Sequence, residues 1–576
     1  MTENLNLIHE RVDDIPFLIG LMVHLHLPEL IDSCLGNHGN HQGLSTGWLI
    51  TIWLAYILSH GDHRKSTVQD WVERHRQTLE QLVGQPIRDV ELNDDRLGIV
   101  LHRLSKTPAW ERLETVLWQS TVTVYSLGLT RVRLDSTTAY GYHTPHTDGI
   151  MRYGQSKDER PDLPQLKLMA AAAEPAGHLV ACDVHPGQKG DDPLYVPLIQ
   201  RVRLLVGQTG LLYLGDAKMS ALATRADIVA HGDYYLVPLA ACGGTVEQQA
   251  AWIERAVATD QMVELFWADK RLLGAGYEFQ RAQTAQVDGQ SVHWDERVQV
   301  IRSPDGAREQ ARHLTSRVNE ALADLAHLTP PLGQGRGHRR YTSEEEIQAA
   351  VSQILQRYAV SGLLRVRWQR EEQTLSHAVG RGRRGPQHPA QTDVRVRYVL
   401  TTIERDEDAI QARIDRLGWH IHVTNVPIAQ VTTDQAVLIY RGGWCLERDF
   451  HLLKDRPLGI SPLYVWRDDQ IIGLTRLLTV AARLLTLIET QVRADLARRK
   501  EALSGLYAGQ PTRTTNQPTA TRLLTAFARA EITLTRIETG NQTLWHITPL
   551  SAMLERVLTS LGLSVALYTR LAENSP

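Results

Sequence analysis

Apolar side chains recur at helical spacing over the first part of the chain. The helical patterns cover 16–35, 47–59, 66–83 and 108–126. Thr107 and Pro108 begin the last of these, as a cap and a proline at the first helical position. We therefore expect a helical N-terminal domain over 1–128.

From Arg131 onward, strand and helix patterns alternate. The strand patterns cover 131–135, 165–174, 178–183, 210–216 and 233–239. Pro175-Ala176-Gly177 joins the second and third strands into a hairpin, and helical patterns follow at 192–206 and 220–231. This order predicts an α/β fold over 129–240, in which helices pack on a mixed sheet.

The periodicity weakens over 241–430, where short strand and helix patterns are mixed. Two Gly/Arg-rich segments, 333–340 and 380–386, lie here, and 331–397 holds twelve Arg, no Lys and six acidic residues. A strand pattern at 419–425 indicates that the chain then returns to the sheet. We expect 241–430 to be a domain inserted into the α/β core.

The last part of the chain is mostly helical in pattern. Residues 440–454, with the sequence YRGGWCLERDFHLLK, contain no proline and predict one continuous helix. A long helix is predicted over 469–499. We expect 431–503 to complete the core, and 504–576 to form a helical C-terminal region after a Gly/Pro/Thr-rich loop.

The composition of the 576 residues is that of a globular protein with several domains: 43% are hydrophobic and 22% charged. The net charge of −3 neither indicates nor excludes a nucleic-acid partner, because the local distribution decides. Four scattered cysteines without a CxxC pair support neither a disulfide framework nor a zinc ribbon. The longest apolar run, 48–58, is shorter than the roughly 20 residues of a membrane span. Without a signal-peptide pattern either, we expect a cytoplasmic protein with no membrane partner.

Three carboxylates are candidates for a metal site. Asp135 and Asp216 each follow a short apolar strand, and Glu447 lies in the predicted helix 440–454. The ends of neighbouring parallel strands meet at one edge of a sheet, where ligands usually bind. Oxygen ligands suit Mg²⁺ or Mn²⁺ better than zinc, and two such ions about 3.5–4 Å apart can drive phosphodiester chemistry. The alternative is that each Asp caps a turn or helix.

Tyr440, Glu447 and Lys454 are spaced by seven residues. Seven residues are close to two helical turns, so a continuous helix would present all three on one face. A carboxylate on such a face needs a partner, which a metal ion or Lys454 could provide.

Together these segments resemble the DDE transposases of bacterial insertion sequences, in the group with the signature Y-x2-R-x3-E-x6-K. Tyr440, Glu447 and Lys454 match three of its positions, and Gly443 stands at the arginine position. Other segments similar to the family are LNDDRLGIVLHRL (92–104), LDST around Asp135, YGQSKDERPDLPQLKL (153–168), LGDAKMS around Asp216 and VTNV (423–426).

The resemblance implies a ribonuclease-H-like core that the insertion interrupts between Asp216 and Glu447. It implies that Asp135 and these two acids bind two Mg²⁺ or Mn²⁺ ions and that the protein cuts and joins DNA. The DNA partners would be terminal inverted repeats and a target, held by a homodimer, and some relatives pass through a hairpin intermediate. Tyr440 and Lys454 would contact the DNA end. The N-terminal helical domain would bind these ends, support dimerisation or serve as a scaffold.

Other functions remain open. A metal-dependent nuclease on the same core would cut DNA without joining it, and a non-catalytic relic of a transposase would only bind it. The presence of all three acids disfavours the relic. Zinc candidates are His143 with His146 and Asp148, and Cys182 with His185, but neither group has a second ligand pair at a known spacing.

Overall fold

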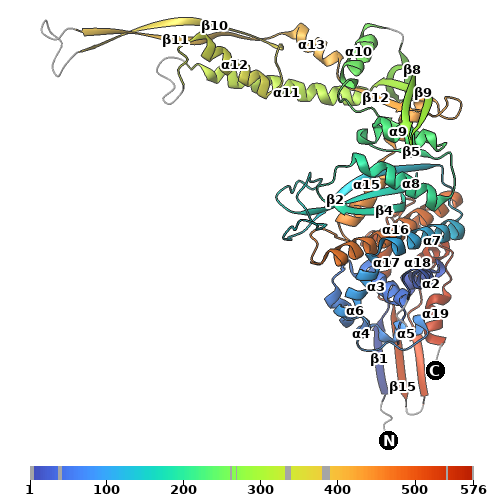
Figure 1. Ribbon diagram of the computed structural model, residues 1–576. Helices are drawn as coiled ribbons and strands as arrows, with labels where there is room; N and C mark the ends of the chain where they lie inside the picture. Colours follow the sequence, from blue (N-terminus) through green and yellow to red (C-terminus); the bar gives the residue numbers. More distant parts are fainter. Residues whose placement is uncertain are drawn as a thin grey trace. The chain divides into compact units, whose positions relative to one another are not determined.

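The structure is a computed structural model that describes residues 5–36, 42–259, 262–267, 269–330, 339–378, 390–539 and 542–573. Its contacts divide the chain into two compact units, whose elements are labelled in Figure 1. Unit 1 comprises Met1–Val237, Ala282–Asp295 and Thr424–Pro576, and unit 2 comprises Pro238–Arg281 and Glu296–Val423. The predicted insertion overlaps unit 2, while the predicted N-terminal, core and C-terminal segments all fall in unit 1. The five domain boundaries themselves stay a prediction.

A mixed sheet forms the centre of unit 1. Its strands are β2 (Arg131–Tyr140), β3 (Gln165–Glu174), β4 (His178–Pro186), β5 (Leu212–Leu214) and β6 (Tyr234–Pro238). They lie in the order β4-β3-β2-β5-β6. The first three are antiparallel, and β5 and β6 run parallel to β2. This is the strand order of a ribonuclease-H-like sheet, and the predicted mixed α/β fold is confirmed.

Helices bury their apolar faces against this sheet. α15 (Trp444–Lys454) packs on β2 and β3, α8 (Tyr195–Val206) on β3 and β4, and α16 (Asp468–Arg499) on β4. α16 has two acids in its first turn and two arginines in its last turn, and these charges interact favourably with the helix dipole. Remaining helices of the core are α9 (Leu222–Ala230) and α14 (Thr433–Arg441).

α16 is also apolar enough, by length and composition, to cross a membrane. However, 89% of its apolar window is buried inside the protein, so its composition is that of a core helix. A bent helix pair, α1 (Ile15–His24) and α2 (Leu27–Leu35), passes the same test only when both are counted as one span.

The N-terminal part of unit 1 is a set of helices that shares a core with α16. Besides α1 and α2 it contains α3 (Thr46–His60), α4 (Val68–Arg74), α5 (Arg76–Val83), α6 (Asp94–Leu104) and α7 (Thr107–Tyr125). α6 packs directly on α16, and residues of both lie in one hydrophobic cluster. The expected helices are present, but they do not form a core of their own.

The two ends of the chain meet in a small sheet of unit 1 (Figure 1). β1 (Leu5–Arg11) pairs antiparallel with β15 (Thr533–Thr539), which pairs with β16 (Gln542–Ile547). The expectation that 504–576 is helical was therefore wrong for these strands. Its helices are α17 (Ala520–Arg529), α18 (Ala552–Ser560) and α19 (Ala566–Glu573).

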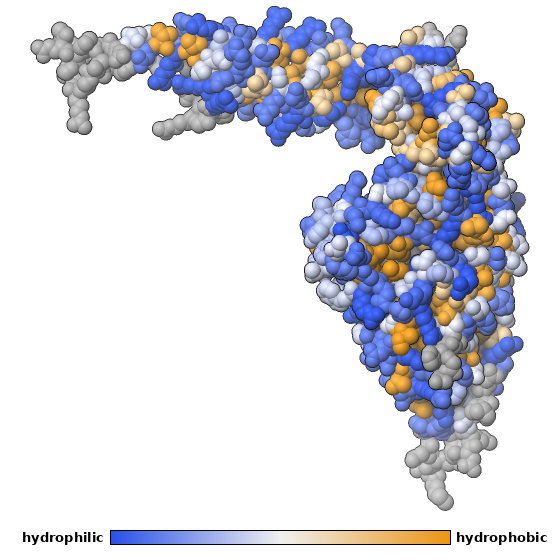
Figure 2. Space-filling view, viewed as in Figure 1, coloured by the Kyte–Doolittle hydropathy of each residue, from blue (hydrophilic) through white to orange (hydrophobic). Residues whose placement is uncertain are grey.

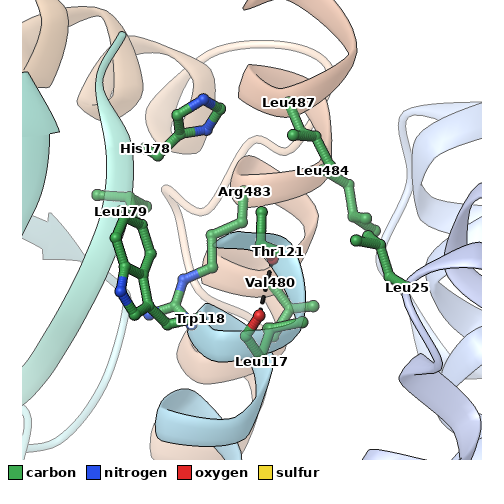
Figure 3. A pocket seen from close by; sticks show the side chains of 10 residues that line it. All are labelled: Leu25, Leu117, Trp118, Thr121, His178, Leu179, Val480, Arg483, Leu484 and Leu487. Atoms are coloured by element: carbon green, nitrogen blue, oxygen red, sulfur yellow. Dashed lines mark hydrogen bonds between the residues drawn. The ribbon is translucent and has the colours of Figure 1, made fainter. Parts of the chain in front are cut away.

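A cationic side chain is buried beside the apolar pocket between α7, β4 and α16 (Figure 3). Arg483 of α16 lines this pocket, pairs with the buried carboxylate of Glu114, and donates to the carbonyl of Val180 at 3.3 Å. Its guanidinium carbon also lies 5.9 Å from the Trp110 ring centroid. A buried charge of this kind is tolerated because it is paired, and breaking the pair is strongly destabilising.

Unit 2 contains strands in the order β12-β9-β8-β7 and a long hairpin of β10 and β11. Their bounds are β7 (Val263–Phe266), β8 (Leu272–Val287), β9 (Gln290–Arg302), β10 (Leu364–Ala378), β11 (Ala390–Arg405) and β12 (Trp419–Thr424). Its helices are α10 (Thr245–Ala258), α11 (Pro304–Leu328), α12 (Glu344–Arg357) and α13 (Glu407–Asp415). Apolar residues of α11 and α12 form a second core with the hairpin.

Some of the arginines counted over 331–397 form ion pairs with acidic residues. On the hairpin, Arg397 bonds Glu371 at 2.6 Å and Arg370 bonds Glu372 at 2.6 Å. Figure 2 shows a mainly hydrophilic surface over this part of the chain. Segment 380–386 and most of 333–340 lie outside the described residues.

One buried carboxyl group of unit 1 makes stability depend on pH. Asp14 is 1% exposed and accepts a hydrogen bond of 2.6 Å from the Ser59 hydroxyl. Burial raises the pKa of Asp14 from 3.8 to about 7. The folded state therefore keeps a proton that the unfolded chain releases between about pH 4 and 7, and stability falls as the pH rises through this window.

We expect Asp14→Asn, which keeps an acceptor for Ser59, to gain stability relative to the wild type as the pH rises from 5 to 7.5. The full linkage is on the order of 4 kcal/mol for a shift of about three units. Urea unfolding at both pH values measures the difference. Asp62→Asn is the control whose difference from the wild type should not change over this range: hydrogen bonds from Arg64 lower the pKa of Asp62 despite its burial, so Asp62 is ionised in both states above pH 5. An equal shift for Asp14→Asn at both pH values would show that Asp14 is ionised in the fold.

Candidate functional site

Asp135 and Asp216 lie side by side because of the register between two parallel strands. Arg133 of β2 pairs with Leu214 of β5, the last pair of that ladder. Asp135 and Asp216 are each two residues further along, so the same register places them next to each other. The prediction that Asp135 ends its strand was wrong, since β2 continues to Tyr140 alongside β3. The parallel partner ends here, however, and this opens one edge of β2.

Donors surround both carboxylates. Asp216 accepts hydrogen bonds from the Tyr195 hydroxyl at 2.7 Å and the Lys218 amide at 2.9 Å. Asp135 accepts from the Ser136 amide at 2.7 Å and from Lys157 Nζ at 3.1 Å. Burial raises the pKa of Asp135, Lys157 partly offsets this rise, and the charge of Asp216 adds to it. The two carboxylates are therefore close enough for their charges to interact.

Burial and the charge of Asp216 also raise the pKa of Tyr195, so its hydroxyl remains a proton donor to that carboxylate. Sequence reasoning did not identify Tyr195. It comes from α8, outside the segments that carry the acids, and a single tyrosine in an amphipathic helix gives no signal.

Lys157 and Asp158 belong to the connection between β2 and β3. While Lys157 bonds Asp135, the neighbouring Asp158 pairs with Lys454 and accepts from Thr138 Oγ1 at 3.2 Å. Side-chain exposure is 20% for Lys454 and 13% for Asp158. The partner of Lys454 is therefore Asp158, and not Glu447 as one sequence hypothesis had it. Lys157 was in a segment that resembles the family, but its role was not predicted.

The predicted continuous helix over 440–454 is wrong. α14 ends at Arg441, α15 begins at Trp444, and Gly442 and Gly443 form the break. Two consecutive glycines weaken a helix, since each has a large conformational entropy to lose. Tyr440 consequently lies on a different helix from Glu447, and the spacing of seven does not place them on a shared face.

Tyr440 nevertheless lies near both aspartates. Burial raises the pKa of Tyr440, the guanidinium of Arg133 lowers it in part, and the charges of Asp216 and Asp135 raise it further. The Arg133 guanidinium carbon is 5.6 Å from the centroid of the Tyr440 ring. Tyr440 therefore reaches the site from α14.

Glu447 lies on the exposed side of α15, the helix that packs on β2 and β3. α15 runs along β2, with Gly443 beside Arg133 at one end and Lys454 linked through Asp158 to β2 at the other. At about 1.5 Å per helical and 3.3 Å per strand residue, Glu447 is ~6 Å beyond Gly443 and Asp135 is ~7 Å beyond Arg133. Among the residues that the structure describes, however, no three His, Cys, Asp or Glu side chains are close enough together to hold a metal ion.

The two neighbouring aspartates supply the carboxylate oxygens that a hard cation prefers, whereas Glu447 lies on a separate element, α15. A second ion-pair network lies beside it. Asp191 pairs with Lys167 and, at 2.5 Å, with Lys218. Although burial raises the pKa of Asp191, the two lysines lower it to about 2. Asp191 thus stays ionised and neutralises lysines next to Asp216.

The zinc candidates do not assemble within the described part of the chain. His143 bonds the carbonyl of Val465 at 2.8 Å, and His146 lies 3.6 Å from Asp468. Burial raises the pKa of Cys182 to about 11 and lowers that of His185 to about 4, which leaves a protonated thiol and a neutral imidazole.

Comparison with known proteins agrees with this geometry. Residues 128–469, more than half of the chain, match the family model described as Transposase DDE domain. Residues 7–116 match a domain of unknown function (DUF4277). No curated protein matches.

One similar solved structure is a piggyBac transposase synaptic complex with hairpin DNA, determined by cryo-EM. The sequence identity is 6% and the TM-score 0.33, over 90% of this chain and 81% of that one. This similarity is too distant to carry an argument. The family match covers β2 through the start of α16, and with it Asp135, Asp216 and Glu447. The chain belongs to the transposase DDE domain family.

Proposed function

We propose that this transposase cuts the ends of an insertion sequence and joins them to target DNA, by cut-and-paste. The observation that carries the proposal is that Asp135 lies beside Asp216, just past the last pair of the β2–β5 ladder, in a chain of this family. We assign Mg²⁺ or Mn²⁺ binding to these two aspartates and Glu447. Two bound ions would activate a water or DNA hydroxyl and stabilise the leaving oxygen of a phosphodiester.

The other side chains of the site orient the carboxylates or hold the DNA. Tyr195 donates to Asp216 and fixes that carboxylate. Tyr440 and Lys454 lie on either side of Glu447 along the chain, and we assign to them contacts with the DNA backbone near the cut. A hairpin intermediate, a homodimeric complex with terminal inverted repeats, and action in the bacterial cytoplasm complete the proposal.

The second candidate, a metal-dependent nuclease, uses the same acids. A strand-transfer assay separates the two: DNA carrying the terminal repeats is incubated with protein, Mg²⁺ and a target plasmid. Joined products support transposition, and cut products without joining support the nuclease. Binding without cleavage would leave the non-catalytic relic.

We expect Asp135→Asn, Asp216→Asn and Glu447→Gln each to abolish cleavage and to leave binding of the DNA ends nearly unchanged. The reason is that the lost charges would hold metal ions and not DNA. Cleavage and gel-shift assays on the same DNA measure both properties. Asp192→Asn, an exposed carboxyl close by in sequence to Tyr195, is the control. Near-normal cleavage by any of the three variants would remove that residue from the site.

Lys157 and a metal ion compete for the same carboxylate oxygen of Asp135. We expect Lys157→Met to bind Mn²⁺ about 5-fold more tightly, since a partly exposed ion pair is worth on the order of 1 kcal/mol. Electron paramagnetic resonance of free Mn²⁺ gives the affinity without any DNA. Lys106→Met, an exposed lysine before α7, should leave the affinity unchanged. Weaker binding by Lys157→Met would show that Lys157 holds Asp135 in the geometry that metal requires.

A DNA contact by Lys454 requires that Asp158 release it. We expect Lys454→Ala to weaken end binding and to reduce the slope of log affinity against log salt by about 0.9, one phosphate contact. Asp158→Asn should instead tighten end binding, because it frees the ammonium. Filter binding from low to high salt measures both, with Lys106→Ala as the control. An unchanged slope for Lys454→Ala would reduce Lys454 to a structural partner of Asp158.

A further inference from the structure

Arg133 is a buried cation two residues before Asp135 on β2. It is 7% exposed, and its Nε donates to Glu174 at the end of β3. Arg131 lies 3.9 Å from the other oxygen of the same carboxylate. Glu174 is itself buried, so this ion pair is well shielded from solvent and depends on its geometry.

The same guanidinium binds the end of α14. Its Nη2 donates to the carbonyls of Ile439 at 3.0 Å and Tyr440 at 3.2 Å. The last carbonyls of a helix have no partner within the helix, and a cation near them also interacts favourably with the helix dipole. Arg133 thereby binds the C-terminal end of α14, just before the chain turns toward α15.

The guanidinium of Arg133 occupies the space that a side chain at position 443 would enter. A Cβ at this position would lie 2.8 Å from Nη1 and 2.9 Å from Cζ of Arg133, which is closer than Cβ atoms normally approach other heavy atoms. The φ of Gly443 is −68°, which any residue can adopt, so a side chain here is opposed by the Arg133 guanidinium and not by backbone conformation. Position 443 is also where the signature has its arginine.

We propose that Arg133 is a positioning residue of the transposase reaction and that its guanidinium fills, from β2, the place of the signature arginine. This inference rests on the proposed function. Arg133 ties the strand that carries Asp135 to the end of α14, directly before the helix that carries Glu447. Since it is held by Glu174 and two carbonyls, its task is to set the distance between the two acids. A lysine can replace it only in part, because one ammonium lacks the planar set of donors.

A swap experiment tests this on the full chain with four variants: Arg133→Ala, Arg133→Lys, Gly443→Arg, and Arg133→Ala combined with Gly443→Arg. We expect Arg133→Ala to lower the maximal cleavage rate by about 100-fold, as for a misplaced catalytic group, with little change in the DNA concentration for half-maximal rate. Mn²⁺ affinity should fall in parallel. Arg133→Lys should be only partly active, and Gly443→Arg alone should be impaired by the clash.

The combined variant is decisive, because an arginine returned from position 443 should restore cleavage and Mn²⁺ affinity well above either single variant. Thermal unfolding of all four proteins reports the same coupling without DNA or metal. A combined variant no better than the worse single variant overturns the inference, as does wild-type cleavage by Arg133→Ala. If the wild type itself neither cuts DNA nor binds Mn²⁺, the proposed function fails, and the positioning role fails with it.

Discussion

Two carboxylates held side by side repel each other, and donors from separate elements of unit 1 offset this repulsion. The parallel register of β2 and β5 fixes Asp135 next to Asp216, so the strands themselves impose the cost. Tyr195 from α8 and Lys157 from the β2–β3 connection supply the compensating donors. Side chains from separate elements thus stabilise the two carboxylates. The negative charge of these carboxylates also suits a divalent cation.

The parts of this arrangement that depend on local pattern could be predicted from the sequence. Alternation in RVRLDST gives a strand, and an apolar run before Asp216 gives its neighbour. The order of strands and helices then limits the topology, and both aspartates follow from it. The charged face of β2 was also visible in principle: Arg131, Arg133 and Asp135 alternate with apolar residues, which is unusual for a strand in the middle of a sheet.

The rest depends on contacts between distant segments, which a single sequence does not reveal. The break between α14 and α15 looks like an ordinary pair of glycines until Arg133, more than three hundred residues earlier, is seen beside Gly443. Lys454 has a plausible partner at Glu447 in the same helix, yet its actual partner Asp158 comes from another part of the chain. The pairing of β1 with β15 has the same origin, since short half-polar strands at opposite ends give no sign that they belong together.

That terminal pairing has a consequence for how the protein is made. β1 leaves the ribosome before its partner β15, which follows more than five hundred residues later. At about 5–20 residues per second, the first strand waits roughly half a minute to two minutes with its backbone unpaired. α16, against which the N-terminal helices pack, is also made late. The small sheet of unit 1 can therefore form only after β15 has been made, and a chain truncated before β15 leaves β1 without its partner strand.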